Sequence, residues 1–295
     1  MRTINLDELE IFRCVAREGG VLRAASQLHR VPSNVTTRIK QLEQRLGVAL
    51  FHRQGRALVL TEPGQTLLTH AERLLHLAAE AEQDVRDGAM RGTLRLGALE
   101  SAAAARLPPV LAAFHARHPD VRVELCTGAT DVLLGQLRRF AVDAVFVSEP
   151  FEPGALATRP VFREELVLIT PANMHAPRGA AALNGCTLVA FGHGCAYRRR
   201  ALQWLSSEGA APARMLELAS YHAIVACVAA GTGVAVVPAQ VLAHATWGSS
   251  VRRHRLPPRM RVSLTHLAWH GQPGTALQAL MAMLPAPPPS PHASP

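Results

Sequence analysis

Apolar side chains recur at helical spacing near the start of the chain and predict three short helices. From Leu6 the apolar positions return every three or four residues until Gly19 ends the first helix. A second helix is expected over 21–29, and a third begins with Pro32 in its first turn and ends at Gly47. The third helix is expected to bury a stripe of four aliphatic side chains with spacings of 4, 3 and 4, namely Val35, Ile39, Leu42 and Leu46.

The second and third helices, joined by a tight turn, are typical of a helix-turn-helix whose second helix enters the major groove of DNA. The other faces of that helix carry polar and basic side chains, which we expect to contact DNA: Ser33, Asn34, Thr36, Thr37 and Arg38. Two apolar runs around a Gln54–Gly55 turn then predict a two-stranded wing, whose arginines Arg53 and Arg56 are expected to touch phosphates. Residues 1–60 are therefore predicted to form a winged helix-turn-helix DNA-binding domain.

One long helix is predicted over residues 61–89, with Thr61 as its N-cap. Its apolar positions are spaced 4, 3, 4, 3 and 4, which is the heptad period of a coiled coil, and they are Leu67, Ala71, Leu74, Ala78, Ala81 and Val85. Either this stripe pairs with a second copy of the chain, or it packs on the core of its own chain. Dimerisation is favoured, because a long helix between two domains would otherwise leave the stripe in water.

Beyond residue 92 the pattern changes to alternating strands and helices, which predicts a parallel α/β fold. A first lobe is expected over 92–160 and a second over 161–265. The strand and helix within 266–284 have no partner of their own, so we expect them to return to the first lobe. The chain would then cross twice between the lobes and leave a ligand-binding cleft at the crossover. The Pro-rich tail, 285–295, is predicted to be disordered.

The charge of the chain favours a polyanionic partner. Its 31 Lys and Arg residues outnumber 22 Asp and Glu residues, and ten of the basic but only five of the acidic side chains fall within the first 60 residues. No signal peptide and no membrane-spanning run are evident, and the five cysteines lack the spacing of a disulfide framework. We therefore expect a cytoplasmic protein that binds nucleic acid and has no membrane partner.

Motifs of catalysis are missing from the sequence. It contains no GxSxG, no HExxH and no Walker loop, and Gly231-Thr232-Gly233 precedes a strand instead of opening a helix. The histidines lack the spacing of metal ligands. We expect no enzymatic activity, no catalytic residues, no cofactor and no metal site.

The chain from Leu6 to Leu284 resembles the LysR-type transcriptional regulators, most clearly in the strings RIKQLEQRLGVALF, GRALVLTEPG and VACVAAGTGVAVVP. The resemblance implies a winged helix-turn-helix, a dimerising linker helix and a two-lobed sensor domain like the type 2 periplasmic binding proteins. It further implies a homodimer or homotetramer that binds promoter DNA, responds to a small-molecule effector and has RNA polymerase as a further partner.

The same resemblance places effector contacts on three segments, which comprise Glu100, Ser101, Gly194, Cys195, Ala196, Tyr197, Arg198, Ser220, Tyr221 and His222. Ser101 follows a strand directly, so we expect it to cap a helix or to offer backbone N–H groups to a carboxylate. Glu100 instead favours an ammonium group. Arg198 is either a carboxylate clamp or part of an exposed charge run, and Cys195 is either a redox-sensitive thiol or a buried inert one. The expected effector is an amino acid, an amine or a carboxylate.

Two other classes of function stay open at this point. The α/β part could be an enzyme or a small-molecule-binding protein fused to a head that does not bind DNA. The whole chain could instead be an architectural protein that bends DNA without an effector, in which case no ligand pocket is expected.

Overall fold

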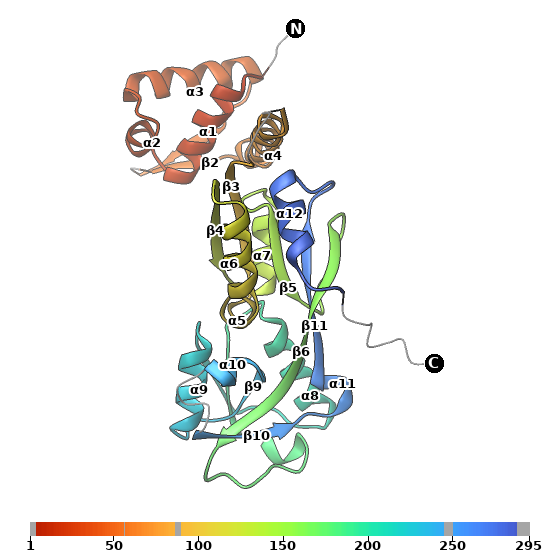
Figure 1. Cartoon of the computed structure of the whole chain (residues 1–295). Helices are drawn as coiled ribbons and strands as arrows, with labels where there is room; N and C mark the ends of the chain where they lie inside the picture. The colour runs from red at the N-terminus through yellow and green to blue at the C-terminus, as the bar shows by residue number, and fades with distance from the viewer. Residues whose placement is uncertain (1–3, 56, 86–89, 245–249, 288–295) are drawn as a thin grey trace. The chain divides into compact units, whose positions relative to one another are not determined.

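The computed structural model describes residues 4–55, 57–85, 90–244 and 250–287 (Figure 1). The chain divides into two compact units. The N-terminal unit consists of residues 1–88 with 139–141, and the C-terminal unit consists of 89–138 with 142–295. Arg56, the expected end of the long helix at residue 89 and most of the Pro-rich tail lie outside the described residues.

Three helices, a hairpin and a long helix make up the N-terminal unit, as the apolar pattern predicts. They are α1 (Leu6–Glu18), α2 (Val21–Gln27), α3 (Pro32–Leu46), β1 (Phe51–Gln54), β2 (Ala57–Leu60) and α4 (Glu62–Val85). Gly19 and Gly47 end α1 and α3 in the left-handed conformation. The expected stripe of α3 is buried except for Leu46, which is 36% exposed. That part of the prediction was wrong, because Leu46 lies in the last turn of α3, outside the apolar cluster that the helices share.

The start of α4 is fixed by hydrogen bonds and by a close approach to the preceding segment. The Thr61 hydroxyl accepts from the Gly64 amide at 3.1 Å, as expected for an N-cap, and donates to the Ala49 carbonyl at 2.7 Å. A Cβ atom on Gly64 would lie 2.1 Å from the Leu50 carbonyl oxygen. Only glycine fits at this position of α4.

The predicted coiled-coil stripe of α4 is divided between two environments. Ala71 is fully buried in the core of its own unit, and Leu67 packs against the same core. Ala71 is therefore unavailable to a partner, which corrects the expectation for that residue. Farther along α4, Leu74 and Leu77 are 42% and 60% exposed, and Ala81 is also exposed.

The C-terminal unit is built on one mixed seven-stranded sheet, in which the strand order is β10-β6-β11-β5-β3-β4 and β9 also pairs with β6 (Figure 1). The strands are β3 (Gly92–Ala98), β4 (Val121–Thr127), β5 (Ala144–Ser148), β6 (Ala157–Pro171), β9 (Ala235–Pro238), β10 (Val251–Arg255) and β11 (Val262–Trp269). Strand β3 is parallel to β4 and β5, as predicted, but β11 runs antiparallel between β5 and β6. The sheet is therefore not purely parallel, because the returning strand enters it in the opposite direction.

The remaining elements of this unit are helices and one small sheet. They are α5 (Glu100–Ala105), α6 (Leu107–Arg117), α7 (Thr130–Arg138), η1 (Ala181–Leu183), β7 (Thr187–Ala190), α8 (Ala196–Ser207), β8 (Arg214–Glu217), α9 (Tyr221–Ala229), α10 (Val241–His244), α11 (Pro258–Arg261) and α12 (Thr275–Met283). Strands β7 and β8 are parallel. None of the helices that the structure describes is long and apolar enough to cross a membrane.

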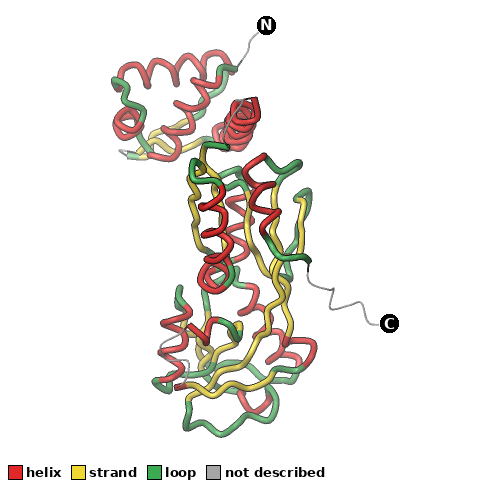
Figure 2. The backbone as a smooth tube through the Cα atoms, in the orientation of Figure 1, coloured by secondary structure: helices red, strands yellow, loops and turns green. Residues whose placement is uncertain are grey.

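Strand β6 is a continuous connection through the C-terminal unit (Figure 2). It pairs with β11 from Ala157 to Glu165, and then with β9 and β10 from Leu166 to Pro171. It runs without a break through residue 160, where the first lobe was expected to end. One strand therefore contributes to both lobes, and we refer below to lobe I (the sheet of β3, β4, β5 and the paired part of β11) and lobe II (β7 to α10).

Candidate DNA-binding face and effector site

Helix α3 has a polar face that is exposed to solvent. Ser33, Asn34, Thr37 and Lys40 are exposed on α3, and Arg38 is half-buried. Thr36 is also half-buried, and its hydroxyl donates to the Pro32 carbonyl at 3.0 Å within the helix. Arg53 is exposed on β1 of the wing.

Most acidic side chains of α1 to α3 have hydrogen-bond or ion-pair partners within the N-terminal unit. Asp7 forms an ion pair with Arg30 at 2.5 Å, and Glu8 pairs with Arg45. Glu43 accepts hydrogen bonds from two backbone amides after α3, at 2.8 and 3.2 Å. In the described part of the chain Arg38, Lys40 and Arg53 form no ion pair. Their charge is available to an external anion such as a phosphate group.

A second cluster lies where lobe I meets lobe II in the C-terminal unit. Glu100 begins α5 in lobe I, and both of its carboxylate oxygens accept from the Tyr221 amide at the start of α9, at 3.3 Å each. Ser101 and Tyr197 are buried, as is the Tyr221 side chain, whose ring meets Phe191 edge-on at 4.8 Å. The structure thus brings predicted residues from three separate segments together. We call Glu100, Ser101, Tyr197 and Tyr221 the Tyr197 cluster.

The Tyr197 hydroxyl is the unusual group of this cluster. It is buried and has no hydrogen-bond partner of standard geometry among the described residues, although the hydroxyls of Ser101 and Ser148 lie beside it. Burial first, and then the negative charge of Glu164, raise the pKa of Tyr197 to about 12. The hydroxyl therefore stays protonated, and the only acceptors beside it among the described residues are the two serine hydroxyls, at poor hydrogen-bond geometry. A buried unpaired polar atom of this kind costs about 1–3 kcal/mol.

Helix α5 begins two residues earlier than the sequence suggests. Its N-cap is Leu99 and no side chain caps it, so the prediction that Ser101 caps the helix was wrong. Ser101 instead lies within the first turn and is 5% exposed. Burial raises the pKa of the neighbouring Glu100, and the hydrogen bond from the Tyr221 amide and the charge of His222 oppose that rise.

Several other predicted effector residues have partners or environments that change their interpretation. The Arg198 guanidinium donates to Glu217 at 2.5 Å and to the Phe191 carbonyl at 3.3 Å, so it is neither a free clamp nor an exposed charge. Burial raises the pKa of the Cys195 thiol, which is the environment of an inert cysteine.

The last four members of the predicted set differ in accessibility. Ala196 is buried at the start of α8, and the carbonyl of Gly194 accepts from the Asp131 amide at 3.4 Å. Ser220 is half-buried at the N-cap of α9, whereas His222 is exposed. His222 therefore lies outside the buried part of the cluster.

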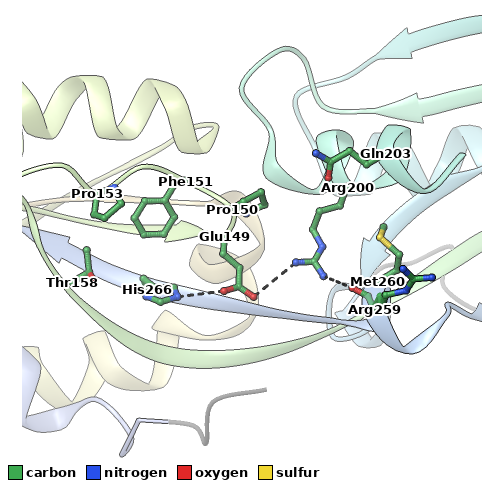
Figure 3. Close-up of a pocket in the computed structure, with 10 residues that line it drawn as sticks. All are labelled: Glu149, Pro150, Phe151, Pro153, Thr158, Arg200, Gln203, Arg259, Met260 and His266. Carbon is green, nitrogen blue, oxygen red and sulfur yellow. Dashed lines mark hydrogen bonds and ion pairs between the residues drawn. The ribbon is translucent and has the colours of Figure 1, made fainter. Parts of the chain in front are cut away.

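A pocket that sequence reasoning missed surrounds Glu149 (Figure 3). Its volume is about 540 Å³, and it is lined from both lobes by Glu149, Pro150, Phe151, Pro153, Thr158, Arg200, Gln203, Arg259, Met260 and His266. The only sequence signal for it is that Glu149 directly follows the buried strand β5, since ligands of α/β folds often bind at the carboxyl ends of strands. In the described residues no group of three or more His, Cys, Asp or Glu side chains is arranged to hold a metal ion.

Family models match both parts of the chain. The model described as "Bacterial regulatory helix-turn-helix protein, lysR family" matches residues 6–65, and the model described as "LysR substrate binding domain" matches residues 87–286. The second match alone spans more than half of the chain.

Whole proteins of the same kind are also similar. The HTH-type transcriptional regulator GltR of Bacillus subtilis is 34% identical over 254 residues, which cover 86% of each chain. The regulator YofA of Bacillus velezensis is 36% identical over 255 residues, covering 86% of this chain and 88% of YofA.

Solved structures show the same fold. A full-length OxyR variant from Pseudomonas aeruginosa superposes with a TM-score of 0.75 at 24% identity, covering 95% of this chain and 94% of that one. Full-length CbnR in complex with its target DNA superposes with a TM-score of 0.67 at 23% identity, covering 95% and 99%.

Proposed function

Since this chain belongs to the LysR family of transcriptional regulators, we propose that α3 and the wing bind promoter DNA and that the Tyr197 cluster binds the effector. The chain is a DNA-binding regulator with an effector-binding domain. Its relatives are regulators and not enzymes, and we propose that this chain too acts without catalysis, in the cytoplasm where the promoter lies.

The proposed DNA contacts fall into two chemical classes. Ser33, Asn34 and Thr37 carry exposed donors and acceptors on α3, which suit base edges in the major groove. Arg38 and Arg53 have no counter-ion among the residues that the structure describes, and their charges suit phosphates. Arg56, although outside the described residues, is proposed as a second wing contact, and Thr36 is proposed as a contact through its methyl group.

Salt dependence separates the two classes of DNA contact. With a duplex from the chain's own promoter region, Arg38→Ala and Arg53→Ala should each weaken binding to every sequence and flatten the plot of log affinity against log salt by about one unit. Asn34→Ala should instead reduce the preference over a scrambled duplex and leave that slope unchanged. Arg252→Ala, an exposed arginine of the C-terminal unit, is the control. Equal slopes for the wild type and both arginine variants would refute the phosphate contacts.

The effector site rests on the unpaired hydroxyl of Tyr197. A ligand acceptor at that position would supply the missing hydrogen bond, and the Glu100 carboxylate nearby suits an ammonium group. We therefore propose an amino acid or an amine with an acceptor group as the effector. Because the cluster is buried, binding requires lobes I and II to move apart and then close on the ligand. That movement would change how the DNA-binding heads are held in the assembly.

Thermal stabilisation of the full chain identifies the effector class. We expect a screen of amino acids, amines and carboxylates to yield compounds that raise the melting temperature. Tyr197→Phe removes only the hydroxyl, so it should weaken such a compound about fivefold, and Glu100→Gln should weaken ammonium compounds in particular. His222→Ala, an exposed member of the predicted set, is the control. If a compound binds the Tyr197→Phe and Glu100→Gln variants as tightly as it binds the wild type, its site lies elsewhere in the chain.

Dimerisation is proposed for the exposed part of the α4 stripe. Of the predicted stripe, Leu74 and Ala81 are exposed and Ala78 is half-buried, and Leu77, which the stripe did not include, is exposed one turn away from Leu74 and Ala81. We propose that they pair with a second copy, giving a homodimer or a homotetramer, and that the DNA-bound assembly contacts RNA polymerase. Leu77→Glu should shift the chain to a monomer in analytical ultracentrifugation, whereas Glu82→Lys, also exposed on α4, should not. A Leu77→Glu variant of unchanged mass would exclude this surface.

A further inference from the structure

We propose that the pocket around Glu149 is a second ligand site, which takes a small organic carboxylate with an apolar body. We call it the Glu149 pocket and define it by the lining residues given above. It lies at the junction of the lobes, because Glu149 directly follows β5 and His266 belongs to β11, whereas Arg200 and Arg259 come from α8 and α11 (Figure 3). Its volume of about 540 Å³ is that of a small-molecule site.

The charges of the lining favour an anion. Two arginines, Arg200 and Arg259, line this pocket together with a single carboxylate, that of Glu149. Glu149 is engaged by the Leu264 amide at 3.1 Å and lies 3.8 Å from Arg200 and 3.7 Å from His266. These last two distances are longer than hydrogen bonds, so Glu149 does not fully occupy the Arg200 guanidinium or the His266 ring.

Buried donors in the lining lack acceptors. The Nε atom of Arg200 and both ring nitrogens of His266 are buried without a hydrogen-bond partner in the described residues. Nη2 of Arg200 is held by the carbonyls of Arg259 and Val262 at 3.2 and 2.6 Å, which fixes the guanidinium in place. A fixed guanidinium with a free edge matches the two oxygens of a carboxylate.

The rest of the lining is apolar and sets the body of the ligand. Phe151, Pro150, Pro153 and Met260 contribute carbon surface, and the Phe151 ring stands edge-on to the His266 ring with centroids 5.4 Å apart. Figure 3 shows Phe151 and Pro153 on the same side of Glu149 as His266, with Arg200 and Met260 on the other side. A carboxylate near Arg200 would therefore direct an apolar group past Glu149 toward Phe151.

This pocket and the Tyr197 cluster use neighbouring residues of one strand end. Ser148 lies beside Tyr197 and hydrogen-bonds to Ser263 at 2.8 Å, whereas Glu149, the next residue, lines the pocket. Successive side chains of an extended segment point in opposite directions, so the two sites lie on opposite faces of this strand end. The second ligand would bind without touching the proposed effector.

Calorimetric titration of the full chain with phenylacetate tests the inference. In a Tris-chloride buffer we expect one phenylacetate per chain and no binding of phenylacetamide, its neutral twin. Arg259→Gln should weaken phenylacetate severalfold and Arg200→Gln about tenfold or more. Glu149→Gln should increase the affinity for phenylacetate several-fold. It removes the competing negative charge but keeps a side-chain oxygen that can accept from the Leu264 amide. Glu149→Gln should thus raise the affinity for phenylacetate, whereas the two arginine variants lower it. A general loss of packing would lower the affinity in all three variants.

Two controls separate this site from its surroundings. Because Arg200 also holds α8 to α11, the exposed Arg259 provides a variant on which folding does not depend. Tyr197→Phe and Arg252→Gln should both leave phenylacetate affinity unchanged. The proposal is overturned if neither phenylacetate nor hexanoate binds. It is also overturned if binding responds to Tyr197→Phe but not to Glu149→Gln and Arg259→Gln. Neither result would affect the proposed effector site, which is tested by the response of amino acids and amines to Tyr197→Phe and Glu100→Gln.

Discussion

The two units present their binding groups in opposite ways. The N-terminal unit keeps its polar side chains on an outer face of α3, while its acidic groups are turned to internal partners. The C-terminal unit encloses Tyr197 and Ser101 between its lobes, where both are at most 5% exposed. The first unit can meet DNA without internal rearrangement, but the second must change shape before a ligand reaches its cluster. In the function proposed above, the response to an effector would therefore depend on the unit whose groups are buried.

The two units share one packing feature, and a substitution at that feature should perturb one unit at a time. Each contains a glycine pressed against a backbone carbonyl. A Cβ atom on Gly64 would lie 2.1 Å from the Leu50 oxygen, and one on Gly233 would lie 2.2 Å from the Thr187 oxygen. Gly233 closes the GTG segment, whose function is therefore the close packing of lobe II.

The largest predicted effect is the loss of one unit at a time. Gly64→Ala should destabilise the N-terminal unit by about 3 kcal/mol and abolish DNA binding, because the backbone must move to admit the methyl group. Gly233→Ala should destabilise lobe II by a similar amount. Amide hydrogen exchange, read by mass spectrometry, should show faster exchange only in the altered unit.

The neighbouring exposed residues provide the controls for this pair. Gln65→Ala and Thr232→Ala should leave exchange unchanged in both units. Faster exchange throughout the chain after either glycine substitution would mean that the units are one cooperative body, contrary to the comparison above.

Breaking a buried ion pair should give the next largest effect. The loss of stability should be larger for the pair in the C-terminal unit than for the pair in the N-terminal unit. Arg106 contacts Glu164 through two hydrogen bonds, at 2.8 and 3.0 Å, whereas Arg17 contacts Glu72 through one, at 3.1 Å. Arg106→Met leaves a carboxylate that is 4% exposed without its partner, so we expect a loss of about 3 kcal/mol in urea denaturation. Glu72 is nearly as buried, at 8%, but its partner Arg17 is half exposed and contributes one hydrogen bond, so Arg17→Met should cost less, about 1 kcal/mol.

Rescue distinguishes an uncompensated charge from lost packing. Glu164→Gln in the Arg106→Met background should recover part of the stability, because it removes the stranded charge. Arg122→Met breaks an exposed pair with Glu124 and should cost less than about 0.5 kcal/mol. If Arg17→Met proved the more damaging of the two, the ranking of the units would be reversed.

The smallest predicted effect concerns the pH dependence of the hidden cluster. The pKa of Glu100 is raised in the folded chain, so the folded state holds this proton to higher pH than the unfolded state does. Its contribution to stability therefore falls as the pH rises from about 4.5 through the raised pKa. Glu100→Gln removes that loss and should stabilise the chain at pH 7 but not at pH 4. The gain should stay below about 1 kcal/mol, because Glu100 is only half-buried.

Thermal unfolding at the two pH values measures this gain. Glu152→Gln, an exposed carboxylate, should change stability equally little at both. A stabilisation by Glu100→Gln that is as large at pH 4 as at pH 7 would show that ionisation of Glu100 is not its origin.

Local patterns in the sequence predict the N-terminal unit well. The periodicity of α3 identifies Val35, Ile39 and Leu42 as buried because helix packing follows a period of 3.6 residues. The same pattern gives the wrong result for Leu46 and cannot assign Ala71, because periodicity does not say where the neighbouring surface ends or which surface covers a stripe.

Features of the C-terminal unit that join distant segments are less predictable. The strand β10, VRRHR, is mostly charged and was not predicted, since pairing with β6 and not its own apolar pattern makes it a strand. The Glu149 pocket joins residues 149–158, 200–203 and 259–266, which no local spacing connects. The Tyr197 cluster could be located only through the family resemblance, and the unpaired state of its hydroxyl requires the three-dimensional arrangement.

Strand β6 constrains how the lobes can move. It changes partners between Glu165 and Leu166, from β11 on one side of that point to β9 and β10 on the other. We expect a rotation centred there to disturb few ladder hydrogen bonds, and to widen one face of the lobe junction as it narrows the opposite face. Compounds lodged on the two faces would then oppose each other mechanically without ever touching, and the regulator would respond to the ratio of their concentrations.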